Sequence, residues 1–192
     1  MNTNNININR MKNMDEFEIT CERYVGYIDI MGFKNIVAKT PHSEVYKMML
    51  KIYECKNLNE NIKWDRIEKK IITTTNYSDS IMIYSKDKSR ESFNAFINTI
   101  SGIIEDMLIE GIPFKGAVSF GMMTLDSKRS IFFGQPLIDS YLLQEELYLY
   151  GIIVHASFEK EMIRHKIDKN RLFLMKYLCP LKKSFNNIPY VC

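Results

Sequence analysis

The sequence predicts an α+β fold in which helices pack on one face of a mainly antiparallel sheet. Segments rich in β-branched and aromatic residues alternate with segments whose apolar residues recur every three or four positions. The strand-like segments also occur in consecutive pairs between helices, an order that favours antiparallel pairing over a purely parallel sheet. A chain of 192 residues has room for one domain with a single apolar core.

The first strand and the first helix follow from these patterns. Residues 22–30, "ERYVGYIDI", form a β-branched and aromatic run that is followed by turn chemistry. A helix is expected over residues 41–62, with His42, Ser43 and Glu44 at its start. Its apolar positions fall at helical spacing: Val45, Met48, Met49, Ile52 and Tyr53.

A hairpin and a second helix come next. Two β-rich runs, 71–75 and 80–84, are joined through "NYSD", which places Asp79 at the turn. Residues 90–110 are predicted to form a helix that Gly111 terminates. The apolar stripe of this helix consists of Phe93, Phe96, Ile97, Ile100, Ile103, Ile104, Met107 and Leu108.

The rest of the chain repeats this alternation. Strands are predicted over 113–125 and 129–134, a third helix over 136–151 and a further strand over 152–158. His155 lies on this last strand, where a single imidazole without a nearby partner is more often structural than a metal ligand. The closing "NNIPYVC" also reads as a strand, and we expect a few further residues to follow it.

Composition argues against several classes of function. The formal net charge is only +3 and both signs are interspersed, so no basic surface for nucleic acid is expected. The four cysteines form no CxxC pair, which argues against a zinc knuckle or a disulfide scaffold and favours a reducing cytoplasm. No run approaches the roughly 18 apolar residues of a membrane helix, so we expect no direct membrane contact. We expect residues 1–20 to be a disordered, asparagine-rich start and residues 21–192 to form the domain.

Two aspartates are the strongest candidates for a functional site. Asp29 ends the first strand and Asp79 lies at the hairpin turn, so the two carboxylates converge if these strands are neighbours. A lone aspartate at a strand end is more often a turn residue or a helix cap, but a pair framed by two apolar strands favours function. Carboxylate oxygens suit Mg²⁺ or Mn²⁺, and Gly32 would let backbone N–H groups approach a phosphate closely.

Four motifs resemble those of the class III nucleotide cyclases, in the same order. "YIDIMGFKNIV" resembles the family's Phe-x-Asp-Ile-x-Gly-Phe signature, and "NYSDSIMIY" resembles its Gly-Asp-Ser hairpin. "IPFKGAVSFG" is similar to the Leu-Arg-x-Gly-Ile-x-x-Gly strand, and "FFGQPLIDSYLLQ" to the Gly-x-x-x-Asn-x-Ala-x-Arg helix entry. The resemblance spans about residues 23–160 and implies a ferredoxin-like cyclase catalytic domain.

The resemblance also implies roles for individual residues. Asp29 and Asp79 would be catalytic and would bind two Mg²⁺ or Mn²⁺ ions, with the backbone carbonyl of Ile30 completing a metal site. The triphosphate would be held by backbone N–H groups and by one lysine, the group comprising Met31, Gly32, Phe33, Lys34 and Lys115. In this family one protomer supplies the metals and its partner supplies base and ribose contacts, so a homodimer is implied.

The sequence departs from the family where the base and ribose are read. Thr75 and Ile131 occupy the positions of the residues that select a purine, so neither the adenine nor the guanine pattern is present. Ile138 and Leu142 stand where the family has a ribose-binding Asn and a transition-state Arg. The nearby polar residues that could take over ribose binding and transition-state stabilisation lie on the same helix: Asp139, Tyr141 and Gln144.

One branch of the family resembles this pattern more closely. In the pyrimidine cyclases of the bacterial anti-phage Pycsar systems, motifs similar to "KGAVSFG", "FFGQPLIDSYLLQEEL", "YGIIVHASF" and "YLCPLKK" occur in this order. The resemblance implies a cytoplasmic lyase that converts UTP, or CTP, to a 3′,5′-cyclic nucleotide and pyrophosphate. The product would act as a second messenger on a separate effector in antiviral defence, and UTP is favoured over CTP.

Three other functions remain open at this point. Ile138 and Leu142 are compatible with a catalytically inactive, nucleotide-binding cyclase homologue. A purine cyclase with an unusual base pocket is a second alternative. The paired aspartates would also suit an unrelated two-metal phosphoryl-transfer enzyme built on a palm-like sheet. Base-stacking candidates of unknown position are Tyr53, Trp64 and Tyr77.

Overall fold

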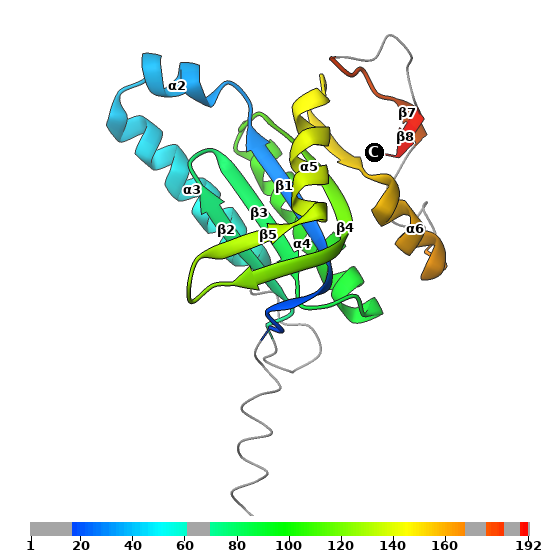
Figure 1. Cartoon of the computed structure of the whole chain (residues 1–192). Helices are drawn as coiled ribbons and strands as arrows, with labels where there is room; N and C mark the ends of the chain where they lie inside the picture. The colour runs from blue at the N-terminus through cyan, green and yellow to red at the C-terminus, as the bar shows by residue number, and fades with distance from the viewer. Residues whose placement is uncertain (1–16, 61–69, 168–175, 183–188, 192) are drawn as a thin grey trace, which may run out of the picture.

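The structure is a computed structural model that describes residues 17–60, 70–167, 176–182 and 189–191. An eight-stranded sheet runs in the order β2-β3-β1-β4-β6-β8-β7, and β5 pairs separately with β4 (Figure 1). The strands are β1 Thr20–Ile30, β2 Ile72–Tyr77, β3 Ser80–Ser85, β4 Phe114–Asp126, β5 Ile131–Gly134, β6 Gly151–Val154, β7 Lys176–Leu178 and β8 Pro189–Val191. The helices are α2 Phe33–Lys39, α3 His42–Glu60, α4 Arg90–Ile109, α5 Gln135–Glu146 and α6 Ala156–Arg164.

The centre of the sheet is antiparallel, as the sequence predicts. β1 pairs antiparallel with β3 on one side and with β4 on the other, and β2 pairs antiparallel with β3. β4 and β6 pair in parallel, and the connection between them runs through β5 and α5. β1 is therefore a central strand, and the residue at its end has a neighbour on each side.

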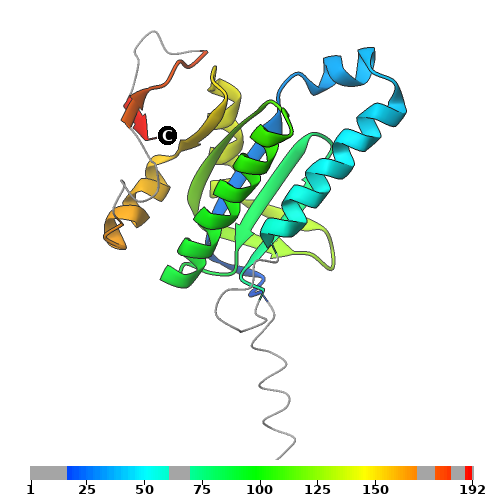
Figure 2. The ribbon, with the colours of Figure 1, turned by 180° about the vertical axis from the view of Figure 1, so that it is seen from behind.

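Helices cover both faces of the sheet, so the prediction that they pack on one face is wrong. Alternate residues of β1 point to opposite faces. Gly26 lies beneath Phe96 and Ile100 of α4, whereas the ring of Tyr27 packs edge-on against Tyr141 of α5, with centroids 5.5 Å apart. We refer to these two sides as the α4 face, which α3 also covers (Figure 2), and the α5 face (Figure 1).

The main core lies on the α4 face. The apolar stripe of α4 packs there on Tyr24, Ile28 and Ile30 of β1, which accounts for the helical spacing seen in the sequence. Phe158 of α6 joins this core through ring contacts with Phe93 and Phe96. The α5 face holds a smaller cluster of Val25, Tyr84, Met123 and Leu125.

Two local predictions differ from the structure. The predicted strand over 152–158 ends at Val154, and α6 begins at Ala156 because His155 caps it: the His155 side chain accepts a hydrogen bond from the Ser157 N–H. His155 is thus a capping residue rather than a strand residue. The hairpin turn is also shorter than predicted, since Tyr77 pairs directly with Ser80 and leaves only Ser78 and Asp79 in the turn.

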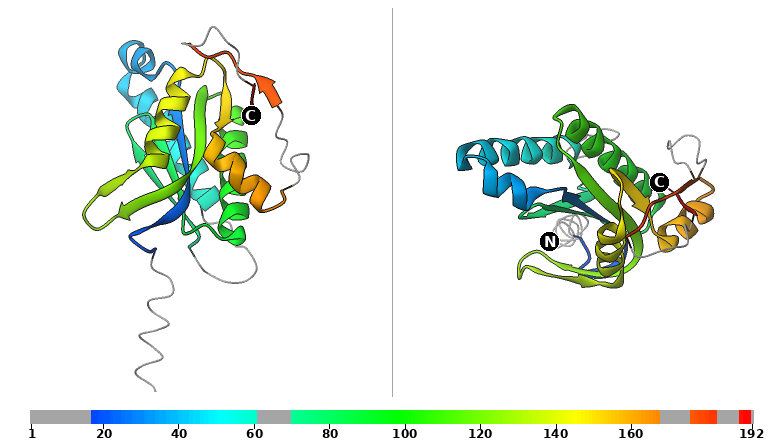
Figure 3. Two further views of the ribbon diagram at one scale, coloured as in Figure 1. Left: turned by 45° about the vertical axis from the view of Figure 1, so that its right-hand side comes forward. Right: turned by 90° about the horizontal axis from the view of Figure 1, so that it is seen from above.

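The β4–β5 hairpin projects from the α5 face, away from the rest of the sheet (Figure 3). Most of the predicted disordered start, residues 1–16, lies outside the described residues. Among the helices that the structure describes, none combines the length and the apolar character needed to cross a bilayer.

Candidate functional site

The two candidate aspartates lie side by side at one end of the sheet. Asp29 is paired with Ser80 of β3 and with Lys115 of β4, so three polar residues form a row across adjacent strands. The backbone N–H of Ile30 donates to the carbonyl oxygen of Asp79 at 3.0 Å, which fixes the hairpin turn against the end of β1. Residues paired across a ladder share a face, so the side chains of Asp29, Ser80 and Lys115 all lie on the α5 face.

The electrostatics of Asp29 reflect this crowding. Partial burial and the neighbouring Asp79 carboxylate raise the pKa of Asp29 to about 6, while Lys115 acts in the opposite direction. Two carboxylates held this close repel each other unless a cation is shared between them. The arrangement is therefore a feature that the folded protein retains at a cost in stability.

A third carboxylate, Glu145 of α5, was missed by the sequence analysis. Its Oε1 lies 3.7 Å from Nζ of Lys115, whose side chain is almost completely buried, and its charge contributes to the raised pKa of Asp29. Glu145 lies within the segment "FFGQPLIDSYLLQEEL", but the family resemblance assigns it no role. Only the packing of α5 over β4 reveals that it contacts the site.

The loop after β1 carries the predicted phosphate-binding residues. The N–H of Met31 donates to the Pro113 carbonyl at 2.9 Å, so the prediction that this N–H is available to a ligand is wrong. Within the described part of the chain, the N–H groups of Gly32, Phe33 and Lys34 donate to no backbone acceptor. Gly32 has φ +74° with no neighbour that a Cβ would meet, a conformation that favours glycine in this tight turn.

The predicted base and ribose residues do not gather around Asp29 within one protomer. Tyr141 lies on the same side of the sheet as Asp29, because its ring contacts Tyr27, two residues before Asp29 on the same face. Thr75 lies two strands away, in the row of Met82 and Tyr27. Asp139 accepts a hydrogen bond from Gln135 at 2.8 Å and faces His155 at 3.8 Å.

Ile131 and the two apolar residues of α5 lie on exposed surface. Ile131 is paired with Asp126 near the tip of the β4–β5 hairpin, at the opposite end of the sheet from Asp29. Ile138 and Leu142 have half of their surface exposed, whereas Gln144 is buried and its Nε2 donates to Glu145. Of the stacking candidates, Tyr53 on α3 and Tyr77 at the hairpin are exposed, and Trp64 lies outside the described residues.

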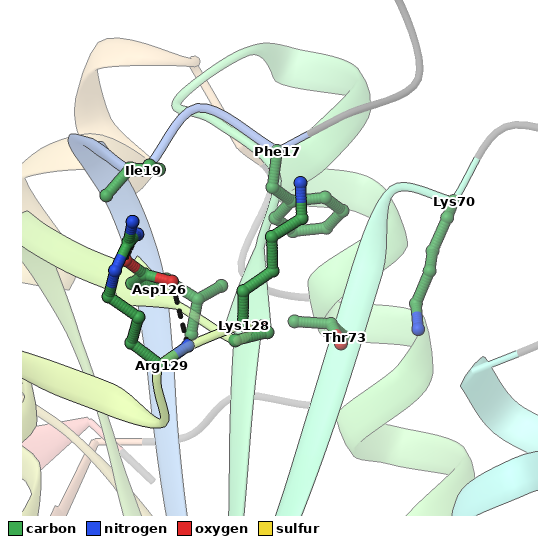
Figure 4. A pocket seen from close by; sticks show the side chains of 9 residues that line it. Phe17, Ile19, Lys70, Thr73, Asp126, Lys128 and Arg129 are labelled. Atoms are coloured by element: carbon green, nitrogen blue, oxygen red, sulfur yellow. Dashed lines mark hydrogen bonds and ion pairs between the residues drawn. The ribbon is translucent and has the colours of Figure 1, made fainter.

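A separate cavity of about 420 Å³ opens at the far end of the sheet. Its apolar walls come from Phe17, Ile19 and Leu125, and Lys128 and Arg129 lie at its edge (Figure 4). The Arg129 guanidinium donates a 2.7 Å hydrogen bond to the Asp126 carboxylate. At about 3.3 Å per strand residue, Ile19 is roughly 30 Å from Asp29, so this cavity is not part of the aspartate site.

The residues at the aspartate site fit a divalent metal ion. The described residues contain no group of three or more His, Cys, Asp and Glu side chains placed to hold a metal. Magnesium, however, needs only one or two protein carboxylates and takes its remaining ligands from water and phosphate oxygens. Asp29, whose pKa is raised, and the neighbouring Asp79 carboxylate form a like-charged donor set that a cation would stabilise.

The fold was compared with those of known proteins. No protein-family model and no curated protein sequence matches the chain. Among solved structures, a bacterial light-regulated adenylyl cyclase superposes with a TM-score of 0.61 at 13% identity, covering 90% of this chain and 88% of that one. The catalytic core of a rhodopsin-guanylyl cyclase with converted specificity, in complex with ATPαS, superposes with a TM-score of 0.57 at 13% identity, covering 76% and 84%. The chain therefore has the fold of class III nucleotide cyclase catalytic domains.

Proposed function

We propose that the protein is a pyrimidine nucleotide cyclase that converts UTP, or CTP, to a 3′,5′-cyclic nucleotide and pyrophosphate. The observation that carries the proposal is the Asp29–Asp79 pair at the end of β1, held together by the Ile30 hydrogen bond on a cyclase fold. Mg²⁺ or Mn²⁺ bound there, two ions per site, would lower the pKa of the ribose 3′-hydroxyl and neutralise the leaving pyrophosphate.

The residues of the chain would bind and orient the substrate. Asp29, Asp79 and the Ile30 carbonyl would hold the metal ions. The three N–H groups of residues 32–34 and the ammonium of Lys115 would contact the triphosphate oxygens, because these donors flank the aspartate pair on the same end of the sheet. In-line geometry between the 3′-hydroxyl and the α-phosphate would then depend on how firmly these groups hold the chain of phosphates.

Pyrimidine specificity is supported by what replaces the purine-reading residues. Thr75 is short and Ile131 is apolar, so neither supplies the charged hydrogen-bond partner that a purine site uses. The resemblance to the Pycsar cyclases adds the remaining parts of the proposal: a cytoplasmic second messenger, a separate effector that senses it, and a role in antiviral defence.

Product analysis tests this function directly. The purified protein would be incubated with Mn²⁺ and each of ATP, GTP, CTP and UTP, and the products identified by mass spectrometry. We expect cyclic UMP or cyclic CMP in equimolar amount with pyrophosphate. Cyclic AMP as the only product would overturn the pyrimidine assignment, and nucleotide polymers would indicate the palm-like alternative.

A second candidate function is a non-catalytic nucleotide-binding protein. The observation that favours it is the exposed apolar pair Ile138 and Leu142, at the positions where the family has its ribose-binding Asn and transition-state Arg. This candidate requires that the protein bind a nucleoside triphosphate without releasing pyrophosphate, which the same incubation would reveal.

A homodimer is part of the proposed function. Exposed apolar side chains occur on the projecting hairpin, at Met122, Ile131 and Phe133, and on α5, at Ile138, Tyr141 and Leu142. These six side chains are referred to together as the patch. A single protomer leaves these side chains in water, and it keeps Ile131 far from Asp29. Pairing of two such surfaces would bury the patch and could bring the hairpin of one protomer to the aspartates of the other.

Replacing Phe133 with aspartate is expected to convert the dimer to a monomer and to remove most turnover. A charge at this exposed apolar position of the hairpin would have to be desolvated on association, which costs several kcal/mol. Sedimentation velocity measures the change of mass. Ile163→Asp is the matched control, because Ile163 is equally exposed on α6, away from the patch; if both variants dissociate, or neither does, the interface is elsewhere.

Replacing Glu145 with glutamine is expected to lower the KM for the nucleoside triphosphate about threefold to tenfold. Glu145 competes with the phosphates for Lys115, and its charge adds to the negative potential at Asp29. Steady-state kinetics at saturating Mn²⁺ measure this change. Glu105→Gln makes the same charge change on an exposed position of α4 and should leave KM as it is; an unchanged KM in Glu145→Gln would contradict the competition.

A further inference from the structure

A hydrogen-bonded chain of three side chains leads to Asp29. Tyr27 lies two residues before Asp29 on β1, so both side chains point to the α5 face. The phenol oxygen of Tyr27 lies 2.7 Å from Oγ of Ser80. Ser80 is buried and is the register partner of Asp29 on β3, so the two side chains stand next to each other on the α5 face. Hydrogen bonding from Ser80 acts to lower the pKa of Asp29, against the effect of burial.

The chemistry of the three groups fixes the direction of this chain. An ionised carboxylate can only accept hydrogen bonds, so the single Ser80 hydroxyl proton is donated to Asp29. The Ser80 oxygen must then accept the proton of Tyr27, which becomes the donor at the start of the chain. The ring of Tyr141 packs edge-on against Tyr27 at 5.5 Å and limits its rotation from the side of α5.

Tyr27 therefore determines where the Ser80 hydroxyl points. Without the phenol, the Ser80 hydroxyl would lose one of the two hydrogen bonds that fix its rotamer, and it would orient the Asp29 carboxylate less firmly. Groups that hydrogen-bond metal ligands from behind orient them, and their removal typically weakens metal binding 10- to 100-fold. The aromatic ring alone would fill the same space, so the hydroxyl is the part of Tyr27 that packing does not require.

We infer that Tyr27 is a positioning residue that acts through Ser80 to hold the Asp29 carboxylate in the orientation that binds a divalent cation. The inference rests on the proposed function, in which Asp29 is a metal ligand. Neither Tyr27 nor Ser80 would touch the metal or the nucleotide; the two would act only through the carboxylate of Asp29.

Mn²⁺ binding tests the inference without measuring turnover. The dissociation constant would be measured by the electron paramagnetic resonance signal of free Mn²⁺, at constant pH, for the full-length protein and its variants. We expect Tyr27→Phe and Ser80→Ala each to bind Mn²⁺ about tenfold more weakly. The double variant should bind no more weakly than Ser80→Ala alone, because Tyr27 acts through Ser80.

The chain offers a matched control in Tyr84. This buried tyrosine lies on β3 on the same face, and its hydroxyl has no hydrogen-bond partner among the described residues. Tyr84→Phe removes the same atom from the same region but leaves the chain to Asp29 intact, so its Mn²⁺ affinity should stay within twofold of the unmodified protein. An equal loss in Tyr84→Phe would overturn the inference, since it would show a general effect of packing.

The possible failures can be told apart. If the unmodified protein binds Mn²⁺ and Tyr27→Phe binds it equally well, the positioning role is wrong and the proposed function stands. If the unmodified protein binds no Mn²⁺, the proposed function fails and the inference fails with it. Melting temperatures of all variants identify unfolding, and Ser80→Ala provides a second route to the same result if Tyr27→Phe does not fold.

Discussion

Replacing Asp29 with asparagine is expected to abolish turnover and, at the same time, to stabilise the metal-free protein. The first effect follows from the loss of a charged metal ligand, which is worth several kcal/mol of transition-state stabilisation, or about 10³-fold in rate. The second follows from the raised pKa of Asp29, because the folded protein holds this carboxylate near Asp79 at a cost. If Asp29 served only to stabilise the fold, its replacement by asparagine would lower the stability of the protein instead of raising it.

The sign and size of the stability effect come from proton linkage. The pKa of Asp29 is about 6 in the folded protein against an ordinary value of 3.8, so the folded state binds the proton more tightly. Stability therefore falls as pH rises from about 4 to 6, and the full cost is present at pH 7. The difference corresponds to about 3 kcal/mol, which solvent screening of this half-buried group reduces to about 1–2 kcal/mol. We expect the melting temperature of Asp29→Asn to rise by about 3–6 °C at pH 7 and to match the unmodified protein below pH 4.

Asp87→Asn is the matched control for this prediction. Burial acts to raise the pKa of Asp87, but hydrogen bonds from Ser89 and Ser92 at the start of α4 outweigh it and lower that pKa. The same substitution should therefore destabilise the protein by about 1 kcal/mol and leave turnover unchanged. Differential scanning calorimetry without metal, together with the product assay, measures both effects. Turnover by Asp29→Asn, or a lower melting temperature for it at pH 7, would remove the basis of the proposed site.

The elements that the sequence predicts well are those with local signals. The spacing of Phe93, Phe96 and Ile100 predicts α4, and the observed helix, Arg90–Ile109, matches the predicted range within a residue. α6 was missed because its start depends on His155, a capping residue outside the usual set of Ser, Thr, Asp and Asn. Its core residue Phe158 reads equally well as part of a short strand, so the pattern alone does not separate the two.

The local sequence pattern also does not predict on which face of the sheet α5 packs. A helix between two strands can cover either face of the sheet, and α5 carries apolar residues on more than one side. The face is determined by contacts between segments that are distant in sequence, such as the 2.8 Å hydrogen bond between the hydroxyl groups of Ser140 on α5 and Ser119 on β4.

In the candidate site, too, some residues have a local sequence signal and others are identified only by contacts between distant segments. The motifs point to Asp29 at the end of β1 and to Asp79 at the β2–β3 turn, and the structure places these two positions side by side. The contacts that modulate Asp29 come from register between strands far apart in sequence, which places Lys115 and Ser80 on either side of it. Tyr27 and Glu145 lie within quoted motif segments, but the motifs assign a role neither to the Tyr27 hydroxyl nor to the Glu145 carboxylate. Their relevance follows from a 2.7 Å hydrogen bond and a 3.7 Å ion pair.

Replacing Gly116 with alanine is expected to destabilise the protein by about 2–3 kcal/mol and to reduce turnover in the protein that remains folded. A Cβ at this position would lie 2.6 Å from the Tyr27 carbonyl oxygen and 2.5 Å from Cδ1 of Ile152. The Ile152 side chain can turn away, but the β1 backbone cannot, so β1 and β4 must move apart. Gly116 is adjacent to Lys115, and the displacement would therefore separate Lys115 from Asp29 as well.

Gly26→Ala separates this effect from the general cost of adding a methyl group to the sheet. Gly26 lies on β1, and the two tightest contacts of its Cβ would be with the ends of side chains, Ile100 Cδ1 at 3.1 Å and Phe96 Cζ at 3.4 Å, while Cβ of Ile83 at 3.6 Å is at ordinary van der Waals distance. These atoms can yield by a few tenths of an ångström, so we expect a loss below about 1 kcal/mol and normal turnover. Urea unfolding gives both free energies, and the product assay at a temperature where both variants are folded gives the rates. Equal losses of stability in the two variants would mean that the close approach of β1 and β4 at Gly116 is not what holds Lys115 beside Asp29.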